Sequence, residues 1–346
     1  MKTAVVVLNW NGFQYLEKFL PVLIENTDDA QIVVVDNQST DESVAFVRAT
    51  FPDVQVILNE SNSGFAKGYN DGLAQIKGQY EYYVLINSDI EVTKNWLPPL
   101  LQKLSSEENI AGVQPKILSY DRKTHFEYAG ASGGFIDKNY YPFCRGRLFD
   151  TLEEDKGQYD NPVEVFWTSG ACMVVKADIY HEFAGLDEDF FAHMEEIDFC
   201  WRVKRNNYSF YVVPSSKVYH VGGGTLQYES PRKTYLNFRN SLYMIHKNYE
   251  GWLFGKMFYR LTLDGVAGVK FLLSLKFKHL WAVFHAHFSY YRHIPTLRKQ
   301  RRELKEQSTT FNQVGLYKAS ILWAYFFKKI KSFKDLNKRF FHSTNS

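Results

Sequence analysis

Short β-branched runs alternate with segments of helical periodicity along the first ninety residues. Residues 4–8, 31–36, 54–58 and 82–86 are apolar runs typical of strands that are covered on both faces. Between them, residues 13–26, 42–50 and 69–76 place apolar side chains at intervals of three or four, which predicts helices. This alternation predicts parallel βαβ units, whose ligand-binding loops lie at the carboxyl ends of the strands.

Each predicted strand ends in polar residues: Asn9, Asp36, Asn59–Asn62 and Asn87–Asp89. One acid after a strand is an ordinary loop feature, but four polar ends at one edge of a sheet indicate a ligand site. The first loop, 9–12, lacks the Gly-x-Gly-x-x-Gly of dinucleotide-binding folds, and no P-loop motif is present. We therefore expect a diphosphate to be neutralised by a metal that a strand-end carboxylate holds.

The composition changes near residue 241. Residues 246–346 hold 19 Lys and Arg against 5 Asp and Glu, whereas residues 1–245 hold 22 against 33. We expect a catalytic domain over 1–240 and a helical, amphipathic region over 241–346, with a solvated basic run at 298–302 and a further helix at 322–339. Interleaved aromatic and basic residues suit a membrane surface, an RNA, or packing on the catalytic domain or a second subunit; we favour the membrane surface and expect no nucleic acid.

The 346-residue chain is 45% hydrophobic, which is enough for a sizeable core. Its start is too quickly polar for a signal peptide, so we expect a cytoplasmic protein. No uncharged apolar run reaches the roughly 18 residues of a spanning helix, which predicts peripheral attachment to the inner face of the cell membrane. The three cysteines form no Cys-x-x-Cys pair and indicate neither zinc nor a disulfide framework.

The densest acidic cluster is Glu195-Glu196-Ile197-Asp198. In a helix, Asp198 would pair with Arg202 at i,i+4, while Glu196 points elsewhere. Asp187 and Asp189 suit loop or capping positions better than that of a base. The two glutamates could be only a solvated helix start, or the paired acids of a glycoside hydrolase, but hydrolysis gives no reason for the nucleotide-like strand ends.

Seven segments, in order, resemble the family 2 glycosyltransferases, a family with the GT-A fold. The likeness is to their bacterial rhamnosyltransferase-like branch and covers roughly residues 3–225. The segments are Val5–Gly12, Val34–Asp41, Asn62–Asn70, Leu85–Asp89, Trp167–Met173, Gly185–Phe191 and Glu195–Arg202.

The resemblance implies an α/β fold with a mixed, nucleotide-binding sheet flanked by helices. It implies that Asp36 accepts a hydrogen bond from a uracil or thymine base, and that Asn9, Asn62, Asn70 and Asn87 lie at the nucleotide sugar. Asp89 would be the last acid of an Asp-x-Asp-like motif and would bind magnesium or manganese. His220, after a predicted strand, would be the second metal ligand.

The family pattern places the catalytic base on the second acid of a Glu-Asp pair, which here is Glu196, beside Glu195. The implied activity is inverting transfer of a sugar from a UDP- or dTDP-sugar, including dTDP-rhamnose, to a glycan or lipid-linked acceptor in cell-surface polysaccharide synthesis. The aromatic, loop-like segment 114–165 could line an acceptor groove or could be packing. A nucleotidyltransferase and a non-catalytic nucleotide-sugar-binding protein remain as alternatives.

Overall fold

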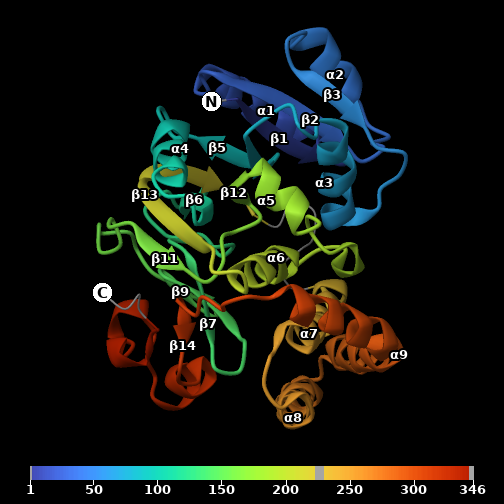
Figure 1. The fold of residues 1–346 in the computed structure, drawn as a ribbon, viewed down its shortest axis with the longest axis vertical. Helices are drawn as coiled ribbons and strands as arrows, with labels where there is room; N and C mark the ends of the chain where they lie inside the picture. The colour runs from blue at the N-terminus through green and yellow to red at the C-terminus, as the bar shows by residue number, and fades with distance from the viewer. Residues whose placement is uncertain (1, 223–229, 343–346) are drawn as a thin grey trace.

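The computed structural model describes residues 2–222 and 230–342 (Figure 1). A nine-stranded sheet runs through the upper part of the molecule in the order β11-β13-β6-β12-β4-β1-β2-β3, with β5 paired to β13. Strands β1 to β4 are mutually parallel where they pair, and β12 enters antiparallel between β4 and β6. The predicted mixed sheet is thus confirmed. The strands are β1 (Thr3–Asn9), β2 (Ala30–Asp36), β3 (Gln55–Leu58), β4 (Tyr82–Asn87), β5 (Ile90–Val92), β6 (Ile110–Ser119), β11 (Val163–Val165), β12 (Cys172–Lys176) and β13 (Ser209–His220).

Both faces of this sheet are covered, as the continuous apolar runs predict. Along β1, Val5 and Val7 pack on one side and Ala4 and Val6 on the other, and all four are buried. One core contains α1 (Phe13–Glu25), α2 (Ser43–Thr50) and α4 (Leu97–Ser105), and the other contains α3 (Gly64–Gln75), α5 (Ala177–Glu182) and α6 (Glu195–Lys204). Helix α3 begins at Gly64, five residues before its predicted start.

A second sheet corrects the expectation that residues 114–165 are loop-like. Its order is β10-β9-β8-β7-β14, and β14 (Leu316–Tyr317), from the end of the chain, pairs parallel to β7. The other strands are β7 (Gly134–Asp137), β8 (Pro142–Cys144), β9 (Arg147–Leu148) and β10 (Thr151–Leu152). Tyr140 and Phe143 are buried here, so these aromatic residues serve packing.

Helices α7 (Pro231–Asn248), α8 (Leu253–Leu273) and α9 (Phe277–Gln307) form the lower end of the molecule, as predicted for the C-terminal part (Figure 1). The basic run 298–302 lies within α9. The prediction of one helix over 322–339 is wrong: this stretch holds the short π-helix η2 (Trp323–Phe327) and the 3-10 turns η3 (Phe333–Asp335) and η4 (Lys338–Phe340). Lys329, with φ at 59°, is left-handed and cannot continue a right-handed helix. Within residues 2–222 and 230–342, no helix is long and apolar enough to cross a bilayer.

Candidate active site

Parallel pairing brings three of the predicted polar strand ends together. Asn9 of β1 lies opposite Asp36 of β2, and Leu8 lies opposite Asn87 of β4. The same register that aligns the apolar interiors of these strands therefore puts their polar ends side by side.

Asp36 is held rigidly at this edge and is only 1% exposed. Asn9 Nδ2 donates to its Oδ1 at 2.8 Å, and Ser39 donates from its backbone nitrogen at 2.7 Å and from its hydroxyl at 2.6 Å. A carboxylate offers about four acceptor positions, so one remains for a ligand. Ser39 was missed in the sequence, although it lies in the loop that directly follows Asp36.

Asn62, in the third loop, and Asn70, on α3, form their hydrogen bonds with residues other than Asp36. Asn62 is exposed, and its Oδ1 accepts from the Gly64 nitrogen at the start of α3. Asn70 Oδ1 accepts from the Tyr180 hydroxyl at 2.7 Å and from Leu186 N, and its Nδ2 donates to Leu186 O at 2.7 Å. Asn70 thus fastens the loop that leads to α6.

His220, the last residue of β13, lies between two carboxylates. Its Nε2 is 3.2 Å from Asp89 Oδ1, and its Nδ1 is 3.2 Å from Glu127 Oε2. All three side chains are buried. Burial opposes a charge on His220, but Glu127 and Asp89 outweigh it and raise its pKa to about 10. Burial likewise opposes ionisation of Asp89, yet the imidazolium lowers the pKa of that carboxyl.

These residues fit a divalent cation between Asp89 and His220 Nε2. Glu127 at Nδ1 would orient the ring and raise its basicity, an arrangement that recurs behind metal-bound histidines. The cation would take the place of the Nε2 proton. Within the described ranges, no three His, Cys, Asp or Glu side chains could hold a metal together. Magnesium commonly binds through one or two carboxylates, with substrate phosphate oxygens and water completing its shell.

Glu195 and Glu196 are the first two residues of α6. Glu195 is 4% exposed and Glu196 is partly buried. Among the described residues, neither Oε2 atom has a hydrogen-bonding partner. Burial raises the pKa of Glu196 to about 7, and burial together with the neighbouring Glu196 raises the pKa of Glu195 well above its ordinary value. A carboxyl whose pKa lies near neutrality, as that of Glu196 does, suits a general base.

The loop 168–171 connects the metal-binding candidates to this pair. Ala171 O accepts from Asn87 N at 3.0 Å, two residues before Asp89. A Cβ atom at Gly170 would lie 3.6 Å from Glu196 Cβ and 3.5 Å from the ring of Phe65. Asn87 and Glu196 thus border the same short loop.

The residues before Glu195 have a strained backbone. Phe191, His193 and Met194 all have positive φ, between 63° and 73°. The buried side chain of Asn240, on α7, donates to the carbonyls of Phe190, Ala192 and His193 at 3.0, 2.9 and 2.7 Å. Residues other than glycine rarely adopt such φ values unless the surrounding structure holds them there, and backbone strain of this kind is common at functional sites. The Asn240 side chain therefore stabilises the loop that positions Glu195 and Glu196.

Asp198 is structural. It is fully buried and accepts from Arg202 Nε at 2.8 Å, Lys247 Nζ at 3.0 Å and Asn248 Nδ2 at 2.7 Å. The predicted i,i+4 pair is confirmed. Asp187 caps η1 (Glu188–Phe190) by accepting from Asp189 N at 3.0 Å, and it also pairs with Lys247. Helix α7 is thereby bound to both ends of the candidate catalytic segment.

The family model "Glycosyl transferase family 2" matches residues 4–170. The low-salt glycan biosynthesis hexosyltransferase Agl10 of Haloferax volcanii is 27% identical over 219 residues, which are 61% of this chain and 66% of the relative, just under two thirds of its length. The N-acetylglucosaminyl-diphospho-decaprenol L-rhamnosyltransferase of Mycobacterium tuberculosis is 20% identical over 79% of this chain and 92% of its own length.

Two solved glycosyltransferases share the fold. GalNAc-T7, solved with UDP, GalNAc and Mn²⁺, superposes with a TM-score of 0.55 at 17% identity, over 72% of this chain and 48% of its own. The mannosyltransferase PcManGT of Pyrobaculum calidifontis, solved with GDP-Man and Mn²⁺, gives 0.50 at 14% identity, over 88% and 84%.

Proposed function

We propose that this chain, whose residues 4–170 match the family 2 glycosyltransferases and whose fold is GT-A, moves a sugar from a nucleotide-sugar donor to a hydroxyl of a glycan or lipid-linked glycan acceptor in cell-surface polysaccharide synthesis. The observation that carries this proposal is the pair Glu195 and Glu196 beside the 168–171 loop, whose other end is bonded to the strand that leads to Asp89. An acid–base pair and a candidate diphosphate site thus border one segment.

The donor is a UDP- or dTDP-sugar, dTDP-rhamnose among them. Asp36, fixed by Asn9 and Ser39, has an acceptor position left for the imide N–H of uracil or thymine. The mycobacterial relative is named as an L-rhamnosyltransferase, which favours rhamnose. Asn62 at the start of α3 and Asn87 at the end of β4 would border the donor, whereas Asn70 would act through the 185–188 loop.

The chemical step is a single displacement with inversion. The Glu196 carboxylate takes the proton of the acceptor hydroxyl as that oxygen attacks the anomeric carbon. A new C–O bond forms, the bond from the anomeric carbon to the phosphate oxygen breaks, and the diphosphate leaves with the bonding pair. Glu195 ionises less readily than an ordinary glutamate, because burial and the neighbouring Glu196 raise its pKa.

Asp89 and His220 would hold a magnesium or manganese ion, which when bound supplies positive charge for the departing diphosphate. Asp89→Ala should weaken donor binding and remove the dependence of activity on the cation. Full activity of the unaltered chain in excess chelator would contradict this assignment.

Release of nucleoside diphosphate from a panel of UDP-, dTDP- and GDP-sugars tests the activity. A nucleotidyltransferase would release pyrophosphate, and a binding protein would release neither. Glu196→Gln should bind donor as tightly as the unaltered chain in calorimetry but turn over roughly a thousandfold more slowly. Near-normal turnover would remove Glu196 as the base, and NMR of the product anomer decides between inversion and retention.

We also propose that the acceptor is presented at the inner face of the cell membrane, where the C-terminal region meets the bilayer. The mycobacterial relative, whose printed name contains a decaprenol-linked diphosphate, supports such an acceptor.

A further inference from the structure

Helix α9 exposes an aromatic stripe. Phe277, Trp281, Phe284, Phe288 and Tyr291 recur at intervals of four and three residues and so share one side of the helix. Each is between 52% and 67% exposed. A helix of a protein that stays in water turns such a side inward. This stripe faces away from the residues of α9 that pack on the protein, among them Ala286 and Tyr290.

Helix α8 has the reverse of the usual surface pattern. It buries an ion pair, with Arg260 Nε 2.9 Å from Asp264 Oδ1, and both residues are less than 5% exposed. Its outer side carries Phe258, Val266 and Leu273, which are 64–79% exposed. Exposed apolar residues are ordinary singly, but a helix that buries an ion pair and exposes several large apolar side chains indicates an apolar neighbour.

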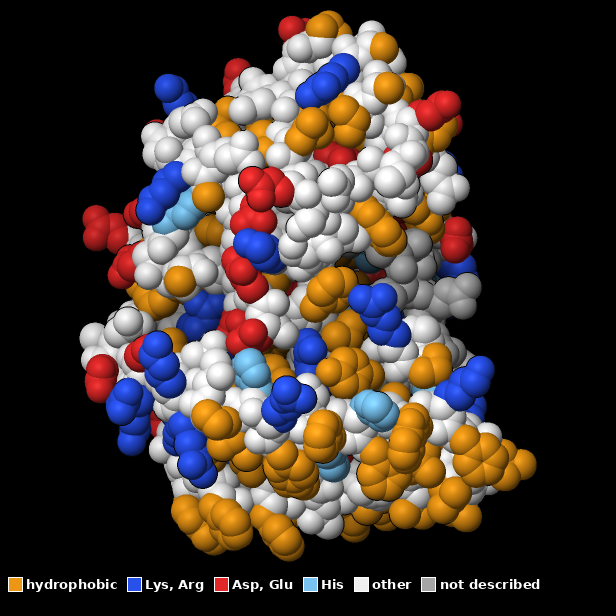
Figure 2. All heavy atoms as spheres, turned by 90° about the vertical axis from the view of Figure 1, so that its right-hand side faces the viewer, with side chains coloured by type: hydrophobic (Ala, Val, Ile, Leu, Met, Phe, Trp, Pro, Cys, Tyr) orange, Lys and Arg blue, Asp and Glu red, His pale blue; other side chains and the backbone are white. Residues whose placement is uncertain are grey.

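The two exposed sides lie at one end of the molecule. In Figure 1, α8 is seen nearly along its axis at the lower end, so it runs across the molecule's long axis. Figure 2 shows hydrophobic side chains gathered at this end, with Lys and Arg side chains above them. We call the exposed apolar side chains of α8, of residues 277–291 and of η2 the apolar base. The nucleotide-binding strands β1 to β3 lie at the opposite end (Figure 1).

Between Trp252 and Tyr291 the exposed charges are all positive. From Trp252 to Tyr291 the only acid is Asp264, which is buried, while Lys270, Lys276 and Lys278 are exposed. Two copies of this face would bring like charges together. An anionic surface would instead be attracted.

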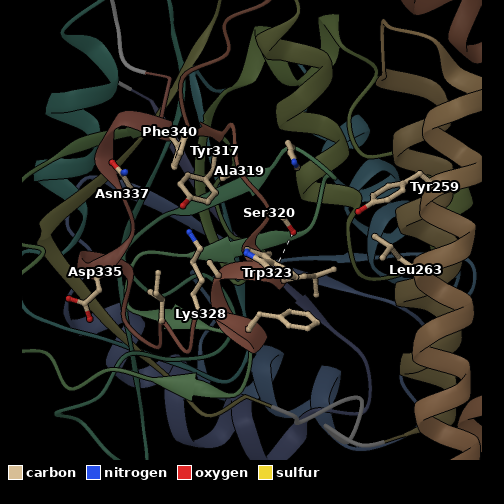
Figure 3. A pocket seen from close by; sticks show the side chains of 15 residues that line it. Tyr259, Leu263, Tyr317, Ala319, Ser320, Trp323, Lys328, Asp335, Asn337 and Phe340 are labelled. Atoms are coloured by element: carbon tan, nitrogen blue, oxygen red, sulfur yellow. Dashed lines mark hydrogen bonds between the residues drawn. The ribbon is translucent and has the colours of Figure 1, made fainter.

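A cavity of about 450 Å³ extends the apolar base between α8 and the C-terminal segment (Figure 3). Tyr259 and Leu263 line it from α8, and Trp323 and Phe327, both more than half exposed, line it from η2. A rigid protein partner with a flat surface would leave this hollow empty. Flexible acyl chains can fill it.

We propose that the apolar base docks in the interfacial layer of an anionic lipid bilayer, with α8 lying in the membrane plane and the α9 stripe inserted beside it. The exposed lysines then lie at headgroup level. Docking itself does not depend on the proposed function. Only its purpose rests on that function, because docking would bring the active site to a lipid-linked acceptor.

Flotation with vesicles tests the docking without donor or acceptor. The full chain is mixed with vesicles of phosphatidylcholine alone or with 30% phosphatidylglycerol. We expect binding to the anionic vesicles, and at least tenfold weaker partitioning of Trp281→Glu/Phe288→Glu. Lys270→Glu/Lys276→Glu should bind about fivefold more weakly for each charge removed and respond less to salt.

Two matched controls use residues outside the base. Leu58→Glu replaces an apolar residue on β3 that is 48% exposed, and Lys94→Glu replaces an exposed lysine before α4. Both should partition as the unaltered chain does, and circular dichroism checks that every variant is folded. Equal partitioning of all variants, or no binding to either vesicle, would overturn the proposal. So would a dimer in sedimentation that Trp281→Glu/Phe288→Glu dissociates, because a second copy would then cover the base. Nucleoside diphosphate release, measured without vesicles, reports separately on the proposed function.

Discussion

Replacing Glu196 with Gln should stabilise the protein while removing its activity. The carboxyl has a pKa of 4.5 as an ordinary Glu and about 7 in the folded chain, because burial disfavours its charge. At pH below 4.5 it is protonated in both the folded and the unfolded state, so folding is not opposed. As the pH rises towards 7, the unfolded chain releases this proton more readily than the folded one. Each pH unit then lowers the free energy of unfolding by about 1.4 kcal/mol.

The total reaches at most about 3 kcal/mol above pH 7, since Glu196 keeps some contact with solvent. A glutamine has nearly the same shape and no charge to bury. Urea unfolding of both chains at pH 5, 6, 7 and 8 should therefore show the advantage of Glu196→Gln growing by up to this amount from pH 5 to 8.

The control is Glu182→Gln, an exposed carboxyl on α5, whose difference from the unaltered chain should stay flat over the same range. A flat difference for Glu196→Gln as well would show that the carboxyl is ordinary in the folded state, and the argument for a base poised near neutrality would fail.

Three further outcomes follow from the same contacts. The turnover number should rise about tenfold per pH unit below pH 7 and level off above it, as Glu196 loses its proton; a pH–rate profile flat from 5 to 8 would contradict this. Asn240→Leu should leave the carbonyls of Ala192 and His193 without this donor, while Phe190 O keeps Arg239. It should cost about 2 kcal/mol in urea unfolding and lower the turnover number more than it raises the donor KM, whereas Asn237→Leu, about one turn earlier on α7, should do neither. Lys247→Met should cost about 3–5 kcal/mol of unfolding free energy, because Asp187 and Asp198 lose a shared buried partner; a melting temperature unchanged in calorimetry would refute it.

The strand ends could be predicted because their geometry follows from local pattern. Apolar runs of five or six residues place β1, β2 and β4, and parallel pairing then leaves little freedom in where Asn9, Asp36 and Asn87 meet. The Asp198–Arg202 pair was equally accessible, since a helix alone sets the i,i+4 distance.

Residues that act across the chain could not be found this way. Glu127 N–H bonds to Ile117 O on β6, and β6 pairs with β13, which ends at His220, although these strands are about a hundred residues apart. Asn240 is a lone amide within an amphipathic helix, and no local pattern reveals that it bonds to carbonyls about fifty residues earlier. The wrong prediction of a helix at 322–339 arose from local pattern itself. The aromatic and basic residues there have a composition that suits an amphipathic helix, but Lys329 adopts a left-handed conformation that interrupts it.

The composition of the chain changes near residue 240, which suggests a domain boundary there, but helix α7 continues through that position. Three side chains of α7 bond to the segment 187–198: Asn240, at this boundary, and Lys247 and Asn248, beyond it. A hybrid enzyme that joins this catalytic half to a different membrane anchor would therefore need its junction after α7, near Gly251. A junction at 240 would keep every proposed catalytic residue and lose two of the three side chains that secure them, and such a graft should fold with an idle active site.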